Sequence, residues 1–140
     1  MRDYRGKRLD TGEWVTGAWL PVTHTIMYEK GLGLPFSAWI VDHATVGQCT
    51  GVFGLFHWQG DVEGGTILRS FIYEGDIVEP VQTLGTYKGF SWGRQVVVFD
   101  RGAFCLKDSR GITTTLRSYS VNVEFKVWGN VHDNPELLEV

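Results

Sequence analysis

The chain has 140 residues, of which 43% are hydrophobic, 14% aromatic and 21% charged, a composition that excludes a disordered, collagen-like or coiled-coil protein. Its 13 lysines and arginines against 16 aspartates and glutamates give a formal charge of −3, which is not the basic character of a general nucleic-acid binder. The 18 glycines and the many aromatic residues favour a turn-rich β protein of one domain with a real core.

Alternation of apolar and polar residues, with clusters of β-branched residues, predicts strands along most of the chain. In the N-terminal part the expected strands are Tyr4 to Leu9, Glu13 to Leu20, Thr25 to Glu29 and Ser37 to Asp42. The first two are joined by a hairpin turn that ends at Gly12. The stretch from Asp42 to Val46 is short and favours one turn of helix.

The segment from Gly51 to Gly65 is the least regular part of the sequence. It holds glycines, aromatic residues and acids with no clear period, which predicts a long loop or an irregular hairpin. Such a segment divides the single domain into two expected β subdomains, of about residues 1–50 and 66–140. A second loop is expected from Gly85 to Gly93.

The C-terminal part contains the clearest hairpin, with strands Gln95 to Phe99 and Ala103 to Lys107 around the turn that ends at Gly102. A second tight turn follows at 108–111, then a half-buried strand from Val121 to Val127 and a terminal turn at 134–138. The predicted fold is therefore mostly β, a small antiparallel barrel or sandwich-like sheets built from hairpins, with very little helix. Most strand aromatics are expected in the core: Trp14, Trp19, Trp39, Phe99 and Trp128.

The residues that carry chemistry show no catalytic or metal-binding pattern. The four histidines and two cysteines have no ligand spacing, and both Cys49 and Cys105 are expected to be buried free thiols. Asp76, in a turn before a strand, is expected to accept hydrogen bonds from backbone N–H groups rather than to act as an acid or base. We therefore predict no catalytic residue, no metal and no cofactor.

Aromatic residues in the glycine-rich segments are the main candidates for binding. They either cover the core or face a partner, where aromatic side chains are effective anchors. The candidate partner-binding residues are Phe53, Phe56, Trp58, Phe90 and Trp92.

A nucleic-acid interface is the alternative use of these aromatics. Arg5, Lys7 and Arg8 would then contact phosphates while the loop aromatics stack on bases. Arg69 and Lys88 are among the cations near the aromatic segments, but several acidic residues oppose them.

Several blocks of the sequence together resemble the YopX family. The blocks are YRGKRLDTGEWVTG, TVGQCTG, YEGDIV, FDRGAFCLKDSRG and GNVHDNPELL, and they occur in the order seen in that family. The resemblance implies a mostly β protein of a bacteriophage or prophage, without established enzymatic activity and without catalytic residues to carry over. Two features depart from the family pattern: Cys49, where an aromatic residue is common, and the long segment from Val52 to Ile72.

These observations favour a non-enzymatic phage or prophage accessory protein that acts through protein–protein contact as a homo-oligomer. A charged N-terminus without a signal-peptide core, and no apolar run of membrane-spanning length, predict the cytoplasm of the bacterial host and no membrane association. A nucleic-acid-binding module is the alternative, and a small hydrolase-like enzyme using a histidine and an acid is the third reading.

Overall fold

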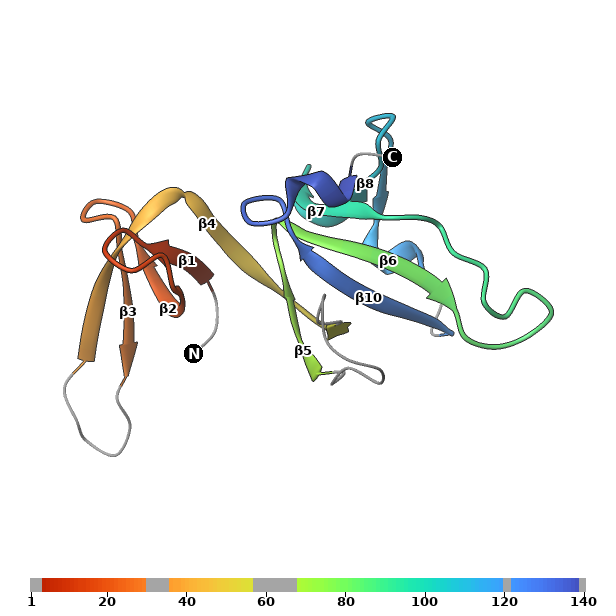
Figure 1. Ribbon diagram of the computed structural model, residues 1–140, viewed down its shortest axis with the longest axis horizontal. Coiled ribbons are helices and arrows are strands. Elements are labelled where there is room, and N and C mark those ends of the chain that lie inside the picture. The colour runs from red at the N-terminus through yellow and green to blue at the C-terminus, as the bar shows by residue number, and fades with distance from the viewer. Residues whose placement is uncertain (1–3, 30–35, 57–67, 120–121, 139–140) are drawn as a thin grey trace. The chain divides into compact units, whose positions relative to one another are not determined.

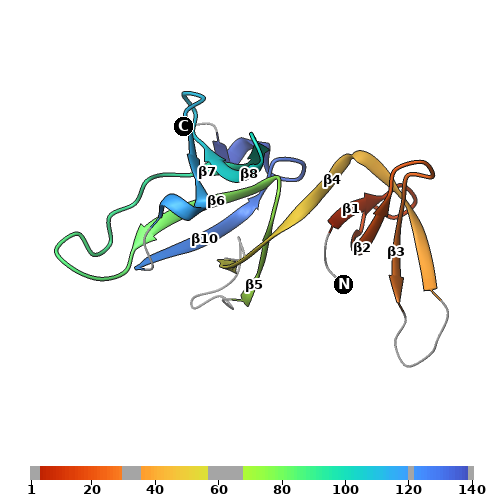
Figure 2. The ribbon, with the colours of Figure 1, turned by 180° about the vertical axis from the view of Figure 1, so that it is seen from behind.

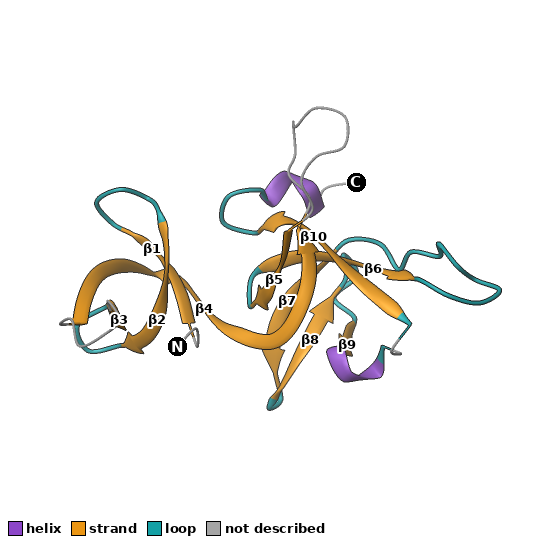
Figure 3. Ribbon diagram, turned by 90° about the horizontal axis from the view of Figure 1, so that it is seen from below, coloured by secondary structure: helices purple, strands orange, loops and turns teal. Residues whose placement is uncertain are grey.

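The computed structural model describes residues 4–29, 36–56, 68–119 and 122–138, and it divides the chain into two compact units (Figure 1). Unit 1 is Met1–Cys49 and unit 2 is Thr50–Val140. The described residues are mostly in strands, with two short 3-10 helices, η1 and η2 (Figure 3). Pairing joins the ten strands in one mixed, largely antiparallel sheet, so the predicted mostly β, antiparallel fold is confirmed.

Unit 1 consists of four antiparallel-paired strand segments. They are β1 (Tyr4–Arg8), β2 (Trp14–Leu20), β3 (Thr25–Glu29) and the first part of β4 (Phe36–Phe56). The pairs β1–β2, β2–β3, β3–β4 and β1–β4 form a closed circuit of hydrogen-bonded neighbours (Figure 2). Ile26 and Val41 are buried inside it, because inward-facing positions of such a circuit lose contact with water.

The predicted helical turn at 42–46 is wrong, because these residues belong to β4, in which Asp42 pairs with Lys7 of β1. Lys7 lies opposite Asp42 and Arg5 lies opposite Gly47, so β4 carries extra residues here as a bulge. Thr45 occupies the bulge: its Oγ1 accepts a hydrogen bond from the Lys7 N–H (2.9 Å) and donates one to the Asp42 carbonyl (2.6 Å). A partner strand supplies the hydrogen bonds that an isolated helical turn would lack.

Unit 2 is built on the end of β4 and six further strands. These are β5 (Leu68–Tyr73), β6 (Asp76–Gln82), β7 (Gln95–Asp100), β8 (Ala103–Lys107), β9 (Thr113–Thr115) and β10 (Val123–Asn130). The order along the sheet is β4-β10-β6-β7-β8-β9, with β5 paired to β4. The β10–β4 pair is parallel, whereas β10–β6, β6–β7, β7–β8 and β8–β9 are antiparallel.

The expected loop at 51–65 is corrected in its first part, because residues 51–56 continue β4. Gly54 explains why the strand persists: a Cβ there would lie 2.7 Å from Val127 Cγ2 and 2.9 Å from Ile72 Cγ1. The absence of a side chain lets β4 approach the core of unit 2 closely. The remainder of the expected loop, including His57, lies outside the described residues.

The turns predicted in the C-terminal part are confirmed. In the β7–β8 hairpin Arg101 and Gly102 have φ of 50° and 79°, as a two-residue hairpin turn with two left-handed residues requires. Asp108 Oδ1 accepts hydrogen bonds from the N–H groups of Arg110 and Ile112, at 2.9 and 3.0 Å. The terminal turn is η2 (Pro135–Leu138), and η1 (Leu116–Ser118) follows β9.

The core of unit 2 is aliphatic. It consists of Ile72, Val78, Val97, Leu106, Leu116 and Val127. The prediction that the strand aromatics form the core is wrong: the four tryptophans are only half-buried and Phe99 is 49% exposed. Cations cover several of these rings instead, for example Arg94, whose Cζ lies 4.9 Å from the centroid of the Trp128 ring.

Buried polar side chains close the turns beside this core. Asp76 is buried, and its Oδ2 accepts a hydrogen bond from the Tyr73 N–H at 2.8 Å, which confirms the expected contact with backbone. Asn134 directly precedes η2, and its Oδ1 accepts a hydrogen bond from the Asn130 N–H at 3.4 Å. Cys105 is buried and Cys49 is half-buried, and both are free thiols.

Candidate interaction surface

The connection between β6 and β7, residues 83–94, is held by backbone hydrogen bonds although it has little regular structure. We call it the β6–β7 loop; it extends beyond the end of β6 in Figure 1. Its first part is bound by the Thr83 N–H, which donates to the Asn122 carbonyl at 2.7 Å. Its returning part lies along β6, where the Gln82 N–H donates to the Phe90 carbonyl (2.8 Å) and the Trp92 N–H to the Pro80 carbonyl (3.1 Å). The loop backbone is therefore fixed to the sheet.

Three large aromatic side chains of this loop face solvent. Tyr87 is 75% exposed, Phe90 52% and Trp92 40%. The Phe90 and Trp92 rings are 5.0 Å apart and nearly perpendicular, at 88°. Tyr119 continues the row, 5.5 Å from Trp92 at 87°, and Phe125 follows, 5.7 Å from Tyr119 at 84°. Such edge-to-face pairs stabilise each other beyond the area they bury.

Trp92 lines two hollows. The first, of about 340 Å³, is lined by Gln82, Tyr87, Phe90 and Trp92. The second, of about 400 Å³, is lined by Gln82, Trp92, Thr114, Ser118, Tyr119 and Val123. Because Trp92 and Gln82 line both, the indole borders an apolar hollow and one with hydroxyl groups. We call the residues that line the two hollows the aromatic surface.

Glu79 on β6 bonds to the β6–β7 loop next to Trp92. Its carboxylate accepts hydrogen bonds from Ser91 Oγ (2.6 Å) and from Trp128 Nε1 (2.9 Å). Partial burial opposes ionisation of this carboxyl group, but the two hydrogen bonds and the charges of Lys126 and Arg94 outweigh that effect, so the pKa of Glu79 lies below its ordinary value. The ionised carboxylate thus holds the residue that precedes Trp92.

Tyr119 is the polar group at the centre of the row. Burial raises the pKa of its hydroxyl group, although a hydrogen bond with Gln95 acts in the opposite direction. Gln95 Nε2 lies 3.4 Å from the Tyr119 hydroxyl and 3.3 Å from the Trp92 carbonyl, so one amide contacts both. The hydroxyl remains protonated at neutral pH and is able to donate a hydrogen bond.

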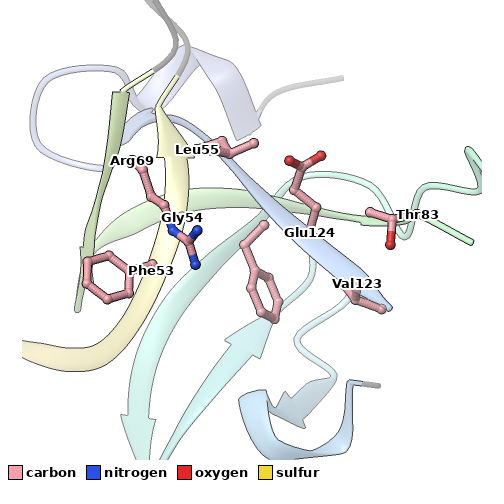
Figure 4. A pocket seen from close by; sticks show the side chains of 8 residues that line it. Phe53, Gly54, Leu55, Arg69, Thr83, Val123 and Glu124 are labelled. Atoms are coloured by element: carbon pink, nitrogen blue, oxygen red, sulfur yellow. The ribbon is translucent and has the colours of Figure 1, made fainter. Parts of the chain in front are cut away.

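Phe53, another predicted binding residue, lies at a different hollow of about 260 Å³ (Figure 4). It is 47% exposed, stacks on Phe71 with centroids 4.4 Å apart, and has the Arg69 guanidinium 5.3 Å from its ring centroid. Glu124 lies across the hollow from Arg69 in Figure 4. The side chain of Phe56 and the whole of Trp58 lie outside the described residues. The structure thus brings Phe90 and Trp92 together and leaves Phe53 at another hollow.

The N-terminal cations contact aromatic and acidic side chains within unit 1. Arg5 is buried, with Cζ 4.7 Å from the centroid of the Trp14 ring, and Lys7 Nζ is 5.6 Å from the same centroid. Arg8 forms an ion pair with Asp10 at 2.6 Å. These contacts place the three cations against the protein itself.

A pair of histidines that sequence spacing did not reveal lies in unit 1. His24 and His43 have ring centroids 5.1 Å apart, and His24 also stacks on Trp19 at 6.3 Å. They meet because the His24 carbonyl accepts a hydrogen bond from the Val41 N–H at 2.9 Å, a contact between distant segments. Among the described residues no group of three or more His, Cys, Asp or Glu side chains is placed to hold a metal ion. No helix in the described ranges has the length and apolar character needed to cross a bilayer.

Fold and surface together define a small β protein of two units that presents a row of aromatic side chains on a hydrogen-bonded loop. The family model described as YopX protein matches residues 23–139, and the chain therefore belongs to the YopX family, whose function is unknown. Four of the five blocks that resemble the family lie within the matched range, and the fifth, YRGKRLDTGEWVTG, precedes it. Neither the curated proteins nor the solved structures include a match to this chain.

Proposed function

We propose that this YopX-family chain is a non-enzymatic accessory protein of a bacteriophage or prophage that acts by binding another protein through the aromatic surface of unit 2. The observation that carries the proposal is the exposure of Tyr87, Phe90 and Trp92 on a loop whose backbone is hydrogen-bonded to the sheet. The setting is the cytoplasm of the bacterial host, and self-association of the chain accompanies its action.

The fixed backbone and the exposed rings of the β6–β7 loop together favour binding. Large aromatic side chains in contact with water do not stabilise the fold as fully buried ones do. When they project from a fixed backbone, less conformational entropy is lost on binding than a mobile loop would lose. Tyrosine and tryptophan are enriched among the residues that dominate binding at protein interfaces. The hydrogen bonds to Pro80, Gln82 and Asn122 supply that fixed backbone.

The nucleic-acid alternative draws less support. Its expected phosphate contacts were Arg5, Lys7 and Arg8, and these side chains already contact Trp14, Trp39 or Asp10. Binding a phosphate would compete with those contacts.

The experiment is a pull-down from lysate of a bacterial host, with and without nuclease, using the full chain and matched variants. We expect a protein that is retained after nuclease treatment, lost with Tyr87→Ala and Trp92→Ala, and kept with Phe99→Ala. Phe99 is the matched control because it is exposed to a similar extent but lines neither hollow of the aromatic surface.

A catch that disappears with nuclease would overturn the proposal in favour of nucleic acid. Retention of the same protein by Tyr87→Ala and Trp92→Ala would move the binding site away from the aromatic surface.

A further inference from the structure

We infer that His24 and His43 form a zinc-binding site on unit 1, with two imidazole ligands from the protein and two coordination positions open to water. The site shares no residue with the aromatic surface of unit 2 and does not depend on the protein-binding role proposed for that surface. It is carried by two histidine side chains that meet across the fold of unit 1 and are engaged in no polar contact with the described residues.

Both imidazole side chains are accessible to a ligand. His24 and His43 are exposed to solvent, and their ring centroids lie 5.1 Å apart. Among the described residues neither ring forms a hydrogen bond or an ion pair, and the ring contacts of His24 are with Trp19 and His43. Each neutral imidazole therefore keeps a nitrogen lone pair, which is the donor that binds a transition metal ion.

Hydrogen bonds to the backbone hold the two histidines where they meet. His24 lies in the turn between β2 and β3, and its carbonyl accepts a hydrogen bond from the Val41 N–H of β4 at 2.9 Å. On either side of His43, the Asp42 Oδ1 accepts a hydrogen bond from the Ala44 N–H at 3.1 Å. The two segments are thus already ordered, so little conformational entropy is lost when an ion binds between the rings.

The spacing of the rings fits a tetrahedral ion. Zinc binds imidazole nitrogen at about 2.0–2.1 Å and is almost always tetrahedral, which places the centroids of two imidazoles on one ion about 5 Å apart. Neighbouring positions of a square-planar copper or nickel ion would bring the centroids to about 4.5 Å. The observed separation of 5.1 Å agrees with the tetrahedral value, and zinc is the ion that prefers it.

Two protein ligands leave the site open. No third His, Cys, Asp or Glu side chain joins the pair within the part of the chain that the structure describes. Water, or a donor group of another molecule, then occupies the other two positions, as it does in zinc sites that keep an open coordination position. Because a structural site uses four protein ligands, we expect weaker binding here, with a Kd of about 1–100 µM.

The test titrates zinc chloride into the full, untagged chain and follows binding by calorimetry and by the carbon–proton NMR signals of the histidine rings. The chain has four histidines, and the ring signals lost in His24→Asn and in His43→Gln identify the two of the site. We expect zinc to shift both of these signals, with one ion bound per chain, and to leave the His132 signal in place. Magnesium chloride should shift neither, because magnesium prefers oxygen ligands.

Single variants show whether the two rings bind one ion together. His24→Asn and His43→Gln should each raise the Kd about tenfold or more, because only one imidazole ligand remains. His132→Gln should leave the Kd within about twofold. Cys49→Ser is a second control, because this half-buried thiol is a zinc ligand by type, and it should bind zinc as the wild type does.

Misfolding of the variants is distinguishable from loss of a ligand. Both histidines are exposed, and asparagine readily adopts the left-handed backbone that His24 has, with φ of 52°. The chain has six tryptophans, and their indole signals in each variant should match those of the wild type, except that of Trp19, which stacks on His24.

Zinc at about 1 mM that shifts neither of the two ring signals, or only one of them, would overturn the inference. Binding that is unchanged in His43→Gln would also overturn it, since the ion would then need only one imidazole of the pair. Loss of binding in Cys49→Ser with retention in both histidine variants would assign the ion to a thiolate site instead.

Discussion

Replacement of Glu79 by glutamine tests how the aromatic surface is held in place. The carboxylate accepts one hydrogen bond from Ser91 and one from Trp128. A hydrogen bond to a charged group contributes about 1.5–3 kcal/mol and a neutral one about 0.5–1.5 kcal/mol, so removing the charge costs about 1 kcal/mol per bond. We expect Glu79→Gln to lower the free energy of unfolding by about 2 kcal/mol at neutral pH, the sum over the two bonds.

Urea unfolding followed by tryptophan fluorescence measures this loss. Small proteins have urea m-values of about 1–3 kcal/mol/M, so the midpoint should fall by about 1 M. If the two units unfold in separate transitions, the shift should occur in that of unit 2. Glu124→Gln is the control, because this carboxylate accepts no hydrogen bond from the described residues.

The pH dependence separates charge from shape. The pKa of Glu79 is lower in the folded chain than its ordinary value of 4.5, so its stabilising contribution is present above that value and is lost as the pH falls through the lower, folded-state pKa. The difference between wild type and Glu79→Gln should therefore shrink on acidification from about pH 7 to about pH 3. Equal stability of the two proteins at neutral pH, or a difference that does not change with pH, would refute the reasoning.

Three other substitutions test the packing. Asp76→Ala should lower the free energy of unfolding by about 1–3 kcal/mol in urea titrations, because it removes the buried acceptor of the Tyr73 N–H; an unchanged midpoint would contradict this. Gly54→Ala should cost about 1–3 kcal/mol, since its Cβ would collide with Val127 and Ile72, and a melting curve like that of wild type would show that β4 does not approach this core so closely. Gly17→Ala should destabilise unit 1, because its Cβ would collide with the Met27 carbonyl oxygen, and hydrogen exchange should report faster opening of β2 and β3 but not of β7 and β8.

The cation-covered rings show where sequence reasoning about the core failed. Tryptophans in predicted strands were expected inside, since strands with apolar residues on one face bury that face. In the structure Trp14, Trp39 and Trp128 are half-buried and lie beneath Arg5, Arg8 and Arg94. No spacing in the sequence marks these pairs as contacts, because the partners of Trp39 and Trp128 come from other strands or from loops.

The candidate surface was predictable only in part. Phe90 and Trp92 were identified because aromatic residues stand out in a glycine-rich segment. Tyr119 and Gln82 were missed, because their role depends on contacts across the sheet rather than on neighbours in the chain. Tyr87 was missed although it lies in the same loop, and its position among the glycines of that segment was a usable signal.

The sequence by itself determined the family, the mostly β class and the local turns, such as the hairpin at Gly102 and the turn at Asp108. These features depend on residues next to each other in the chain, whose backbone preferences and short side-chain hydrogen bonds act without a distant partner. Only the tertiary structure decided that residues 42–46 and 51–56 are strand, and that Trp92 meets Tyr119. Strand pairing and side-chain contact depend on what lies across the sheet, so the same local sequence adopts the conformation that its partners stabilise.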